Sequence, residues 1–125
     1  DAACLFESIS SPGGSIRAGK GAQRSIMAGL NCGTPSLAAW PLLRVGVDAF
    51  IAIDDAEAED AMRRLARSNV TSGESGAAGL AGLIAIAGQP EARAAMGLDA
   101  GAAVLVVSTE GATDPVHWTR VVGGH

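Results

Sequence analysis

The stretch AAVLVVSTEGATDP, Ala102 to Pro115, decides the fold class expected for this chain. Residues 102–108 are apolar up to Ser108 and rich in valine, which predicts a buried β-strand. The strand runs into a turn without a polar break, and Asp114 before proline is typical of a helix start. A second strand is expected at residues 49–53, within VDAFIAIDD.

Helical patterns fill most of the sequence on either side of these two strands. Thr34-Pro35 indicates a helix start, and Asp54 or Asp55 is expected to cap a helix with an apolar face and a basic last turn. Gly-rich residues lead into an Ala/Leu helix that is apolar nearly all round and therefore expected to be central. The helices are expected at residues 2–9, 35–44, from Asp54 or Asp55 to Arg67, 75–87, 89–96 and 115–121.

This order of elements predicts an α/β domain with a parallel sheet. Two strands separated by about fifty residues of helix imply a right-handed crossover and parallel pairing. Two strands are too few for a parallel sheet that is buried on both faces. The sheet is therefore expected to be incomplete, with residues 1–125 a segment of a larger domain, and a start at Asp1 rather than Met favours the same interpretation.

Composition excludes several function classes. The chain is 48% hydrophobic with two Trp, two Phe and no Tyr, and its net charge of −4 leaves no basic stripe with stacking aromatics for nucleic acid. No apolar run approaches the roughly 20 residues that span a bilayer, and no leader peptide is visible, so a cytoplasmic protein that binds no membrane is expected. Cys4 and Cys32 are interpreted as two buried or half-buried thiols, ahead of a disulfide or a catalytic role.

The loop GGSIRAGKG, Gly13 to Gly21, comes one residue short of a phosphate-binding loop. Gly14 and Gly19-Lys20 match G-x-x-x-x-G-K, but Gly21 stands where the motif needs Ser or Thr to bind magnesium. The upstream segment LFESISSP is a poor central strand, so an exposed flexible loop is favoured over a nucleotide site. Lys20 is the only lysine, and in a polar loop it lacks the desolvation that activates a Schiff-base lysine.

Two further stretches carry polar groups in places where ligands bind. GESGAAG, Gly73 to Gly79, lies before a helix whose first N–H groups attract anions, although close packing explains such glycines more often. Glu74 there would be a costly unpaired charge beside an apolar helix. Ser108, Thr109 and Glu110 follow a strand at the end where parallel sheets bind ligands. An ordinary strand-to-helix loop remains equally open on pattern alone.

Taken in order, SIMAGLNCGTPS, SGESGAAGL and VLVVSTEGATDP resemble the C-terminal part of the diaminopropionate ammonia-lyase family. That family belongs to the tryptophan-synthase-β-like, fold type II enzymes that use pyridoxal 5′-phosphate, together with threonine synthase and threonine dehydratase. The resemblance covers nearly the whole chain, from Ile26 to Val122, and only the GGSIRAGKG loop, which lies before Ile26, departs from it. It implies the C-terminal portion of a layered parallel-sheet domain in a cytoplasmic enzyme, expected to be a homodimer as a full-length chain.

The resemblance also implies an activity and a cofactor site. The whole enzyme would convert 2,3-diaminopropionate into pyruvate and ammonia by α,β-elimination, with its Schiff-base lysine and acid–base residues upstream, so that this segment alone carries no catalytic residue. Ser108 matches the hydroxyl placed against the pyridine nitrogen, Glu74 and Ser75 match the helix-entry turn beside the ring, and residues 31–36 match the substrate side.

Two alternatives to this activity stay open. One is another β-eliminating or β-replacing enzyme of the same superfamily, similar to threonine synthase or threonine dehydratase. The other is a truncated α/β remnant or small interaction module without catalysis, which the absence of a buried lysine favours.

No metal site is expected from either the cysteines or the histidines, because their spacing is not that of metal ligands.

Overall fold

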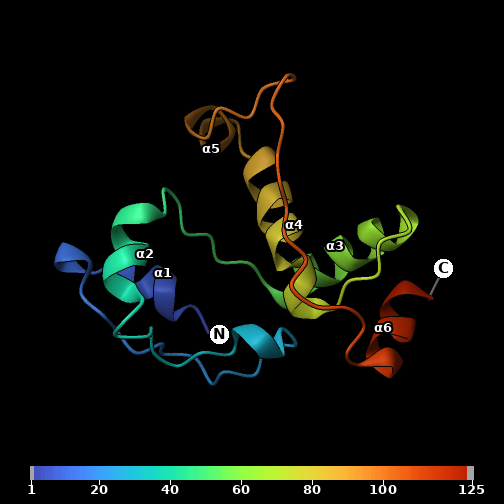
Figure 1. Cartoon of the computed structure of the whole chain (residues 1–125), viewed down its shortest axis with the longest axis horizontal. Coiled ribbons are helices and arrows are strands. Elements are labelled where there is room, and N and C mark those ends of the chain that lie inside the picture. Colours follow the sequence, from blue (N-terminus) through green and yellow to red (C-terminus); the bar gives the residue numbers. More distant parts are fainter. Residues whose placement is uncertain (1, 124–125) are drawn as a thin grey trace. The chain divides into compact units, whose positions relative to one another are not determined.

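The computed structural model describes residues 2–123 as helices joined by irregular segments (Figure 1). Asp1, where the sequence begins, lies outside the described residues. The chain divides into two compact units, residues 1–52 and 53–125. The first holds α1 (Cys4–Ile9), η1 (Pro12–Gly14), η2 (Ala28–Leu30) and α2 (Trp40–Gly46). The second holds α3 (Asp55–Arg67), α4 (Glu74–Ala87), α5 (Pro90–Ala95) and α6 (Pro115–Val122).

Helix α2 fastens the glycine-rich loop in the first unit. The Trp40 indole donates to the Gly14 carbonyl at 2.9 Å, and Arg44 donates to the Gly13 carbonyl at 3.0 Å. Both glycines have positive φ angles of 67° and 63°, which favour glycine at this turn. Residues 15–24 form no helix, whereas a phosphate-binding loop opens one. The loop is largely exposed, as expected, and is held at its glycine turn.

The expected helix at residues 35–44 is wrong in its start, because α2 begins at Trp40. A proline inside a helix lacks the N–H for its hydrogen bond, and its ring clashes with the carbonyl four residues earlier. Pro41 therefore stands in the first turn of α2, where no such bond is needed. Thr34-Pro35 precedes the helix by a turn, and the proline that starts α2 is Pro41.

The two cysteines are both free thiols with different environments. Cys4 is buried, whereas Cys32 is exposed, so the expectation of two buried or half-buried thiols is wrong for Cys32. Burial raises the pKa of the Cys4 thiol, and the nearby Cys32 thiol raises it further. Since the thiolate is the nucleophile, Cys4 is both hidden and less often ionised.

Alkylation should therefore distinguish the two thiols. We expect iodoacetamide at pH 8 to modify Cys32 in a fast phase and Cys4 in a slow phase, because only Cys32 is exposed. Mass spectrometry of tryptic peptides at successive times measures both rates. In the control variant Cys32→Ser the fast phase should vanish while the slow phase persists. Equal rates at the two residues would contradict the burial of Cys4.

Helices α3 and α4 pack against each other and form the centre of the second unit (Figure 1). Asp54 caps α3 through a capping box with Glu57, in which each side chain accepts from the other residue's N–H. Small side chains at the interface let the helices approach closely. The buried core consists of Ala61, Met62, Ala77, Ala81 and Val121, with Ile53, Leu65, Leu80, Trp118 and Val122 packed around it. The expected central position of α4 is confirmed for its first turn, residues 74–77, and for Ala81 and Gly82, which are buried.

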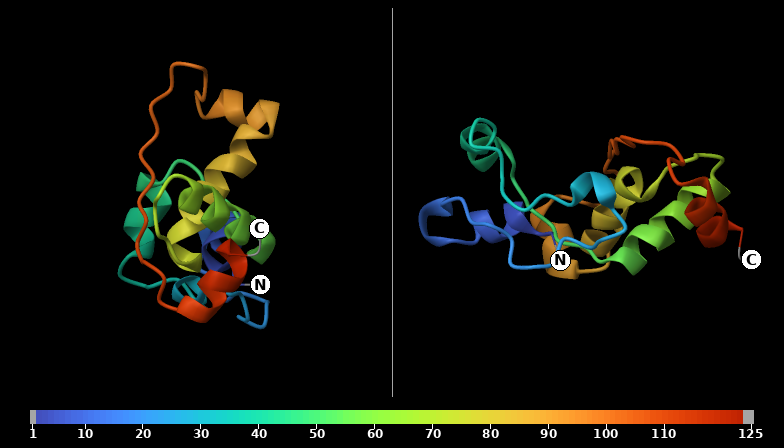
Figure 2. Two further views of the ribbon diagram at one scale, coloured as in Figure 1. Left: turned by 90° about the vertical axis from the view of Figure 1, so that its right-hand side faces the viewer. Right: turned by 90° about the horizontal axis from the view of Figure 1, so that it is seen from below.

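The strands expected at residues 49–53 and 102–108 are wrong as strands, because no strand occurs among residues 2–123. Residues 102–112 form a connection without regular structure that runs from the α5 side toward α6 (Figure 2). Leu105 in this connection is 88% exposed. A strand exists through ladder hydrogen bonds to a neighbour, and neither segment forms such a ladder among the residues that the structure describes. Several of their apolar side chains, among them Ile51, Val104 and Val107, are exposed for the same reason.

Candidate cofactor site

The structure brings together two of the polar stretches that the sequence singles out. Residues 72–77 at the start of α4 are all buried, and residues 108–111 lie directly against them. The Gly73 N–H donates to the Glu110 carbonyl at 3.3 Å, and the Ser75 N–H donates to the Glu110 carboxylate at 2.8 Å. These contacts span about 35 residues of sequence, since Ser75 and Glu110 are 35 apart. The α4 entry and the Ser108 segment therefore form one site.

A pair of serine hydroxyls lies at the centre of this site. The hydroxyl oxygens of Ser72 and Ser108 are 2.8 Å apart. Ser72 is buried, whereas Ser108 is exposed and donates to the Glu110 carbonyl over a longer distance of 3.2 Å. When Ser72 donates to Ser108, the Ser108 proton is free to leave this weak bond for another acceptor. Ser108 can therefore present a hydroxyl donor to a ligand while Ser72 holds it in place.

Ser72 was not among the sequence-derived site residues, nor was Trp118, which donates from its indole to the Ser72 carbonyl at 3.1 Å. The first serine of SGESG was the available signal for Ser72. Trp118 lies 46 residues away from Ser72, and no local pattern reveals that contact. Trp118 on α6 thus fixes the position of Ser72, and through Ser72 the position of the serine pair.

Glu110 caps helix α4 from a distant part of the chain. The N-cap residue Gly73 has no side chain to accept from the first N–H groups of the helix. The Glu110 carboxylate replaces it by accepting the Ser75 N–H, and its negative charge suits the positive end of the helix. The Glu110 carboxylate therefore stabilises the start of α4 and the fold of the candidate site.

Glycines permit the close approach of the two segments. A Cβ atom at Gly73 would lie 2.4 Å from the Gly111 carbonyl oxygen, and one at Gly76 would lie 2.6 Å from the Ser72 hydroxyl and 2.7 Å from the Glu110 carbonyl oxygen. Close packing thus explains Gly73 and Gly76, as the less specific interpretation of this glycine-rich stretch predicts. The same packing creates the serine pair.

Glu74 is buried next to a histidine. Its residue is 6% exposed, and its carboxylate lies 3.8 Å from Nε2 of His117 on α6. The Glu59 carboxylate on α3 lies 3.7 Å from the same nitrogen. His117 was not singled out in the sequence, although it follows the Asp114 cap of α6 by three residues. The Glu74 carboxylate, which the sequence predicts to be a costly unpaired charge, therefore has a polar neighbour from another helix.

The substrate-side residues expected at 31–36 belong to the other compact unit. The Asn31 amide donates to the Ser25 carbonyl at 2.7 Å, and its buried Oδ1 atom has no hydrogen-bond partner within the described part of the chain. Their role toward a substrate stays a prediction.

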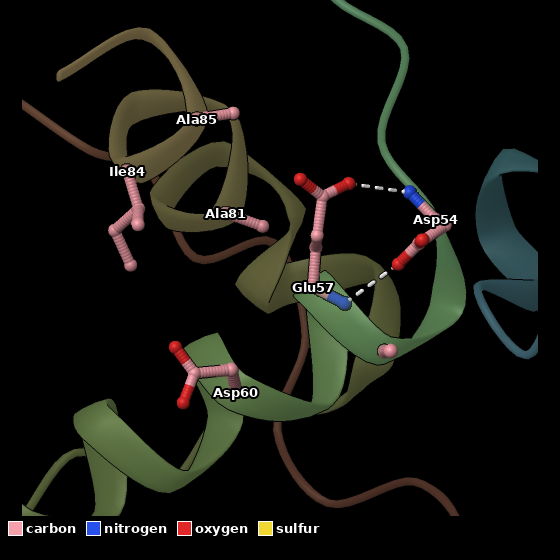
Figure 3. A pocket seen from close by; sticks show the side chains of 7 residues that line it. Asp54, Glu57, Asp60, Ala81, Ile84 and Ala85 are labelled. Atoms are coloured by element: carbon pink, nitrogen blue, oxygen red, sulfur yellow. Dashed lines mark hydrogen bonds between the residues drawn. The ribbon is translucent and has the colours of Figure 1, made fainter. Parts of the chain in front are cut away.

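A separate pocket of about 280 Å³ lies between α3 and the second half of α4 (Figure 3). Its carboxylates already have partners, because Asp54 and Glu57 form the capping box and Asp60 pairs with Arg64 at 2.7 Å. None of the expected site residues lines it. Its lining residues are Asp54, Ala56, Glu57, Asp60, Ala81, Ile84 and Ala85. The pocket therefore follows from helix packing and adds no chemistry to the site.

Residues 2–123 contain no cluster of three or more His, Cys, Asp or Glu side chains suited to a metal ion. None of the helices formed by them is both long enough and apolar enough to cross a membrane.

Comparison with known proteins gives consistent matches. Residues 4–110 match the family of pyridoxal-phosphate dependent enzymes. The diaminopropionate ammonia-lyase of Escherichia coli (strain K12) is 41% identical over 110 residues, which are 82% of this chain and 28% of that protein. The corresponding lyase of Salmonella typhimurium (strain LT2) is 37% identical over 128 residues, covering 95% of this chain and 32% of that protein.

A solved structure is also similar. The crystal structure of diaminopropionate ammonia-lyase from Escherichia coli in complex with D-serine superimposes with a TM-score of 0.77 and 36% identity. The match covers 97% of this chain and 31% of that one. The chain thus spans less than a third of each of these relatives.

Proposed function

The chain belongs to the pyridoxal-phosphate dependent enzymes, as part of a fold type II enzyme, and from this premise we propose that it forms the ring-binding part of a diaminopropionate ammonia-lyase. The whole enzyme would convert 2,3-diaminopropionate into pyruvate and ammonia. The observation that carries the proposal is the contact between the α4 entry and the Ser108 segment, centred on the 2.8 Å pair of serine hydroxyls.

The chemistry of these donors fits a pyridine ring. A pyridine nitrogen accepts a hydrogen bond, and Ser108 offers an accessible hydroxyl whose present bond to the Glu110 carbonyl is weak at 3.2 Å. Ser72 is buried behind it and supports it. When bound, pyridoxal phosphate would supply the electron sink that acidifies the α-proton of an amino acid.

Ser108 would also limit the strength of that electron sink. A neutral hydroxyl donates a hydrogen bond but brings no negative charge to the ring nitrogen, so it favours a protonated ring less than a carboxylate would. Elimination needs only modest stabilisation of negative charge, because the β-amino group leaves at once. The residue at position 108 is thus compatible with elimination and unfavourable to transamination.

A chimera tests the proposal. We would replace the matched segment of the Escherichia coli lyase with this chain, which aligns with 28% of that protein. The chimera is expected to bind pyridoxal phosphate, seen as a visible absorbance band, and to release pyruvate from 2,3-diaminopropionate. A folded chimera without the band would contradict the proposed function. Faster turnover of serine or threonine would instead indicate another β-eliminating enzyme of the family.

Ser108→Ala in this chimera tests the site itself. Loss of one neutral hydrogen bond, about 0.5–1.5 kcal/mol, should weaken cofactor binding by about tenfold or less and leave some elimination activity. Thr109→Ala, which removes an exposed hydroxyl one residue further on, is the matched control and should leave cofactor affinity unchanged. Fluorescence titration with pyridoxal phosphate measures both constants. If the two variants bind pyridoxal phosphate with equal affinity, Ser108 does not contact the cofactor ring.

A further inference from the structure

His117 has one ring nitrogen whose hydrogen-bonding need is unmet. The imidazole side chain is 14% exposed, and its Nε2 atom is buried and has no hydrogen-bond partner among residues 2–123. Two carboxylate oxygens face this nitrogen, from Glu59 on α3 at 3.7 Å and from Glu74 on α4 at 3.8 Å. Both separations are longer than a hydrogen bond, so one carboxylate must move closer before the ring nitrogen can donate to it.

Arg120 determines which nitrogen of His117 carries the proton. Its guanidinium Nη2 lies 3.1 Å from Nδ1 of His117, one turn earlier on α6. A guanidinium group can only donate, so Nδ1 must accept and the neutral ring must carry its proton on Nε2. Arg120 thus directs the single imidazole N–H toward the two carboxylates.

Of these two carboxylates, Glu74 depends more on His117. Glu59 also accepts from Arg63 at 3.1 Å and is 29% exposed, so it has both an ion pair and water. The Glu74 side chain is only 8% exposed, and among residues 2–123 His117 is the one basic side chain within 4.0 Å of it. A buried carboxylate gains more from a hydrogen-bond donor than an exposed one.

We propose that His117 is a positioning residue that holds the Glu74 carboxylate toward α6 and away from the first N–H groups of α4. Those N–H groups attract any nearby carboxylate. Glu110 already accepts the Ser75 N–H at 2.8 Å, and a released Glu74 side chain would compete with it. His117 would in this way protect the contact that places Ser108. The link from this contact to the cofactor rests on the proposed function.

The geometry favours positioning over proton transfer. A histidine that relays protons uses both of its nitrogens, one on each side. Here both carboxylates face Nε2, while Arg120 occupies Nδ1. The ring can therefore donate to one carboxylate at a time, but it cannot pass a proton between them without first losing its contact with Arg120.

The tautomer is tested on the chain itself. In ¹⁵N NMR spectra we expect the neutral His117 ring to be protonated at Nε2. Arg120→Leu should produce a mixture of tautomers, whereas Arg64→Leu should not, because Arg64 pairs with Asp60 on α3. A ring protonated at Nδ1 in the parent chain would overturn the proposal.

Two substitutions test the donor. The terminal amide nitrogen of glutamine can occupy the place of histidine Nε2, while that of asparagine reaches only the place of Nδ1. In the chimera, His117→Asn should weaken pyridoxal phosphate binding about tenfold, equivalent to about 1.4 kcal/mol, and His117→Gln should stay within about threefold of the parent. If His117 served packing alone, both substitutions would weaken pyridoxal phosphate binding to a similar degree. Equal losses of affinity, or no loss in either variant, would therefore overturn the proposal.

Urea unfolding of the chain separates this inference from the proposed function. The midpoint should be lower for His117→Asn than for His117→Gln, whether or not a cofactor binds. If the unsubstituted chimera fails to bind pyridoxal phosphate, the proposed function fails, while the tautomer and the unfolding midpoints still decide the role of His117. Equal midpoints, or a ring protonated at Nδ1, would refute that role.

Discussion

Gly76→Ala is expected to lower the free energy of unfolding of the second unit by about 2 kcal/mol, although alanine normally stabilises a helix by about 1 kcal/mol relative to glycine. The new Cβ atom would lie 2.6 Å from the Ser72 hydroxyl, 2.7 Å from the Glu110 carbonyl oxygen and 3.0 Å from the Ser108 hydroxyl. Both segments must move apart to admit it, which also breaks the 2.8 Å bond between the serines. Urea unfolding followed by circular dichroism measures the change.

Gly79→Ala is the matched control, one turn further along α4. Its Cβ atom would meet a Val106 methyl group at 3.3 Å, and this neighbour belongs to the irregular segment 102–112. The valine can shift by a few tenths of an ångström, so the helical preference of alanine should leave the unit equally stable or more stable. If Gly76→Ala were as stable as this control, the close approach of Ser108 to α4 would be refuted.

Glu110→Ala is expected to lower the free energy of unfolding by about 1.5 kcal/mol. The substitution removes the carboxylate that accepts the Ser75 N–H at 2.8 Å. That N–H lies in the buried first turn of α4, where Gly73 offers no side chain in place of the lost acceptor. The same measurement by urea unfolding applies.

Two further variants make this expectation specific. Glu110→Gln keeps an oxygen acceptor but loses the charge, so about half of the effect should return, as expected from neutral and charged hydrogen bonds. Glu91→Ala removes an exposed acidic residue from the first turn of the short helix α5 and should change stability by less than about 0.5 kcal/mol. A loss at Glu110 no larger than that at Glu91 would exclude capping of α4 across the chain.

Helix ends with local caps could be predicted from the sequence. Asp54 caps α3 and Asp114 caps α6, as their positions before the apolar pattern and before Pro115 indicate. Such signals work because the capping side chain and the N–H that it binds are three residues apart. A local rule also sets the start of α2, since Pro41 excludes a helix running through from residue 35.

The sequence also predicted which two stretches make up the candidate site, but not how they meet. The helix entry at Glu74 and Ser75 and the segment at Ser108 were both expected beside one ligand, and they do lie together. Their meeting rests on Glu110, a cap supplied from 35 residues away. No pattern within one helix or loop encodes a bond of that separation.

Local patterns in the sequence thus predicted the capped helices and the apolar, central helix α4. Three short stretches carried the family resemblance. Only the tertiary structure decided that residues 102–108 lack ladder partners and that Ser72 supports Ser108. It also placed His117 against Glu59 and Glu74 from two other helices. The physical reason is range: propensity and capping act within one helical turn, whereas ladders, buried hydroxyl pairs and the partners of a buried histidine depend on residues that only folding brings together.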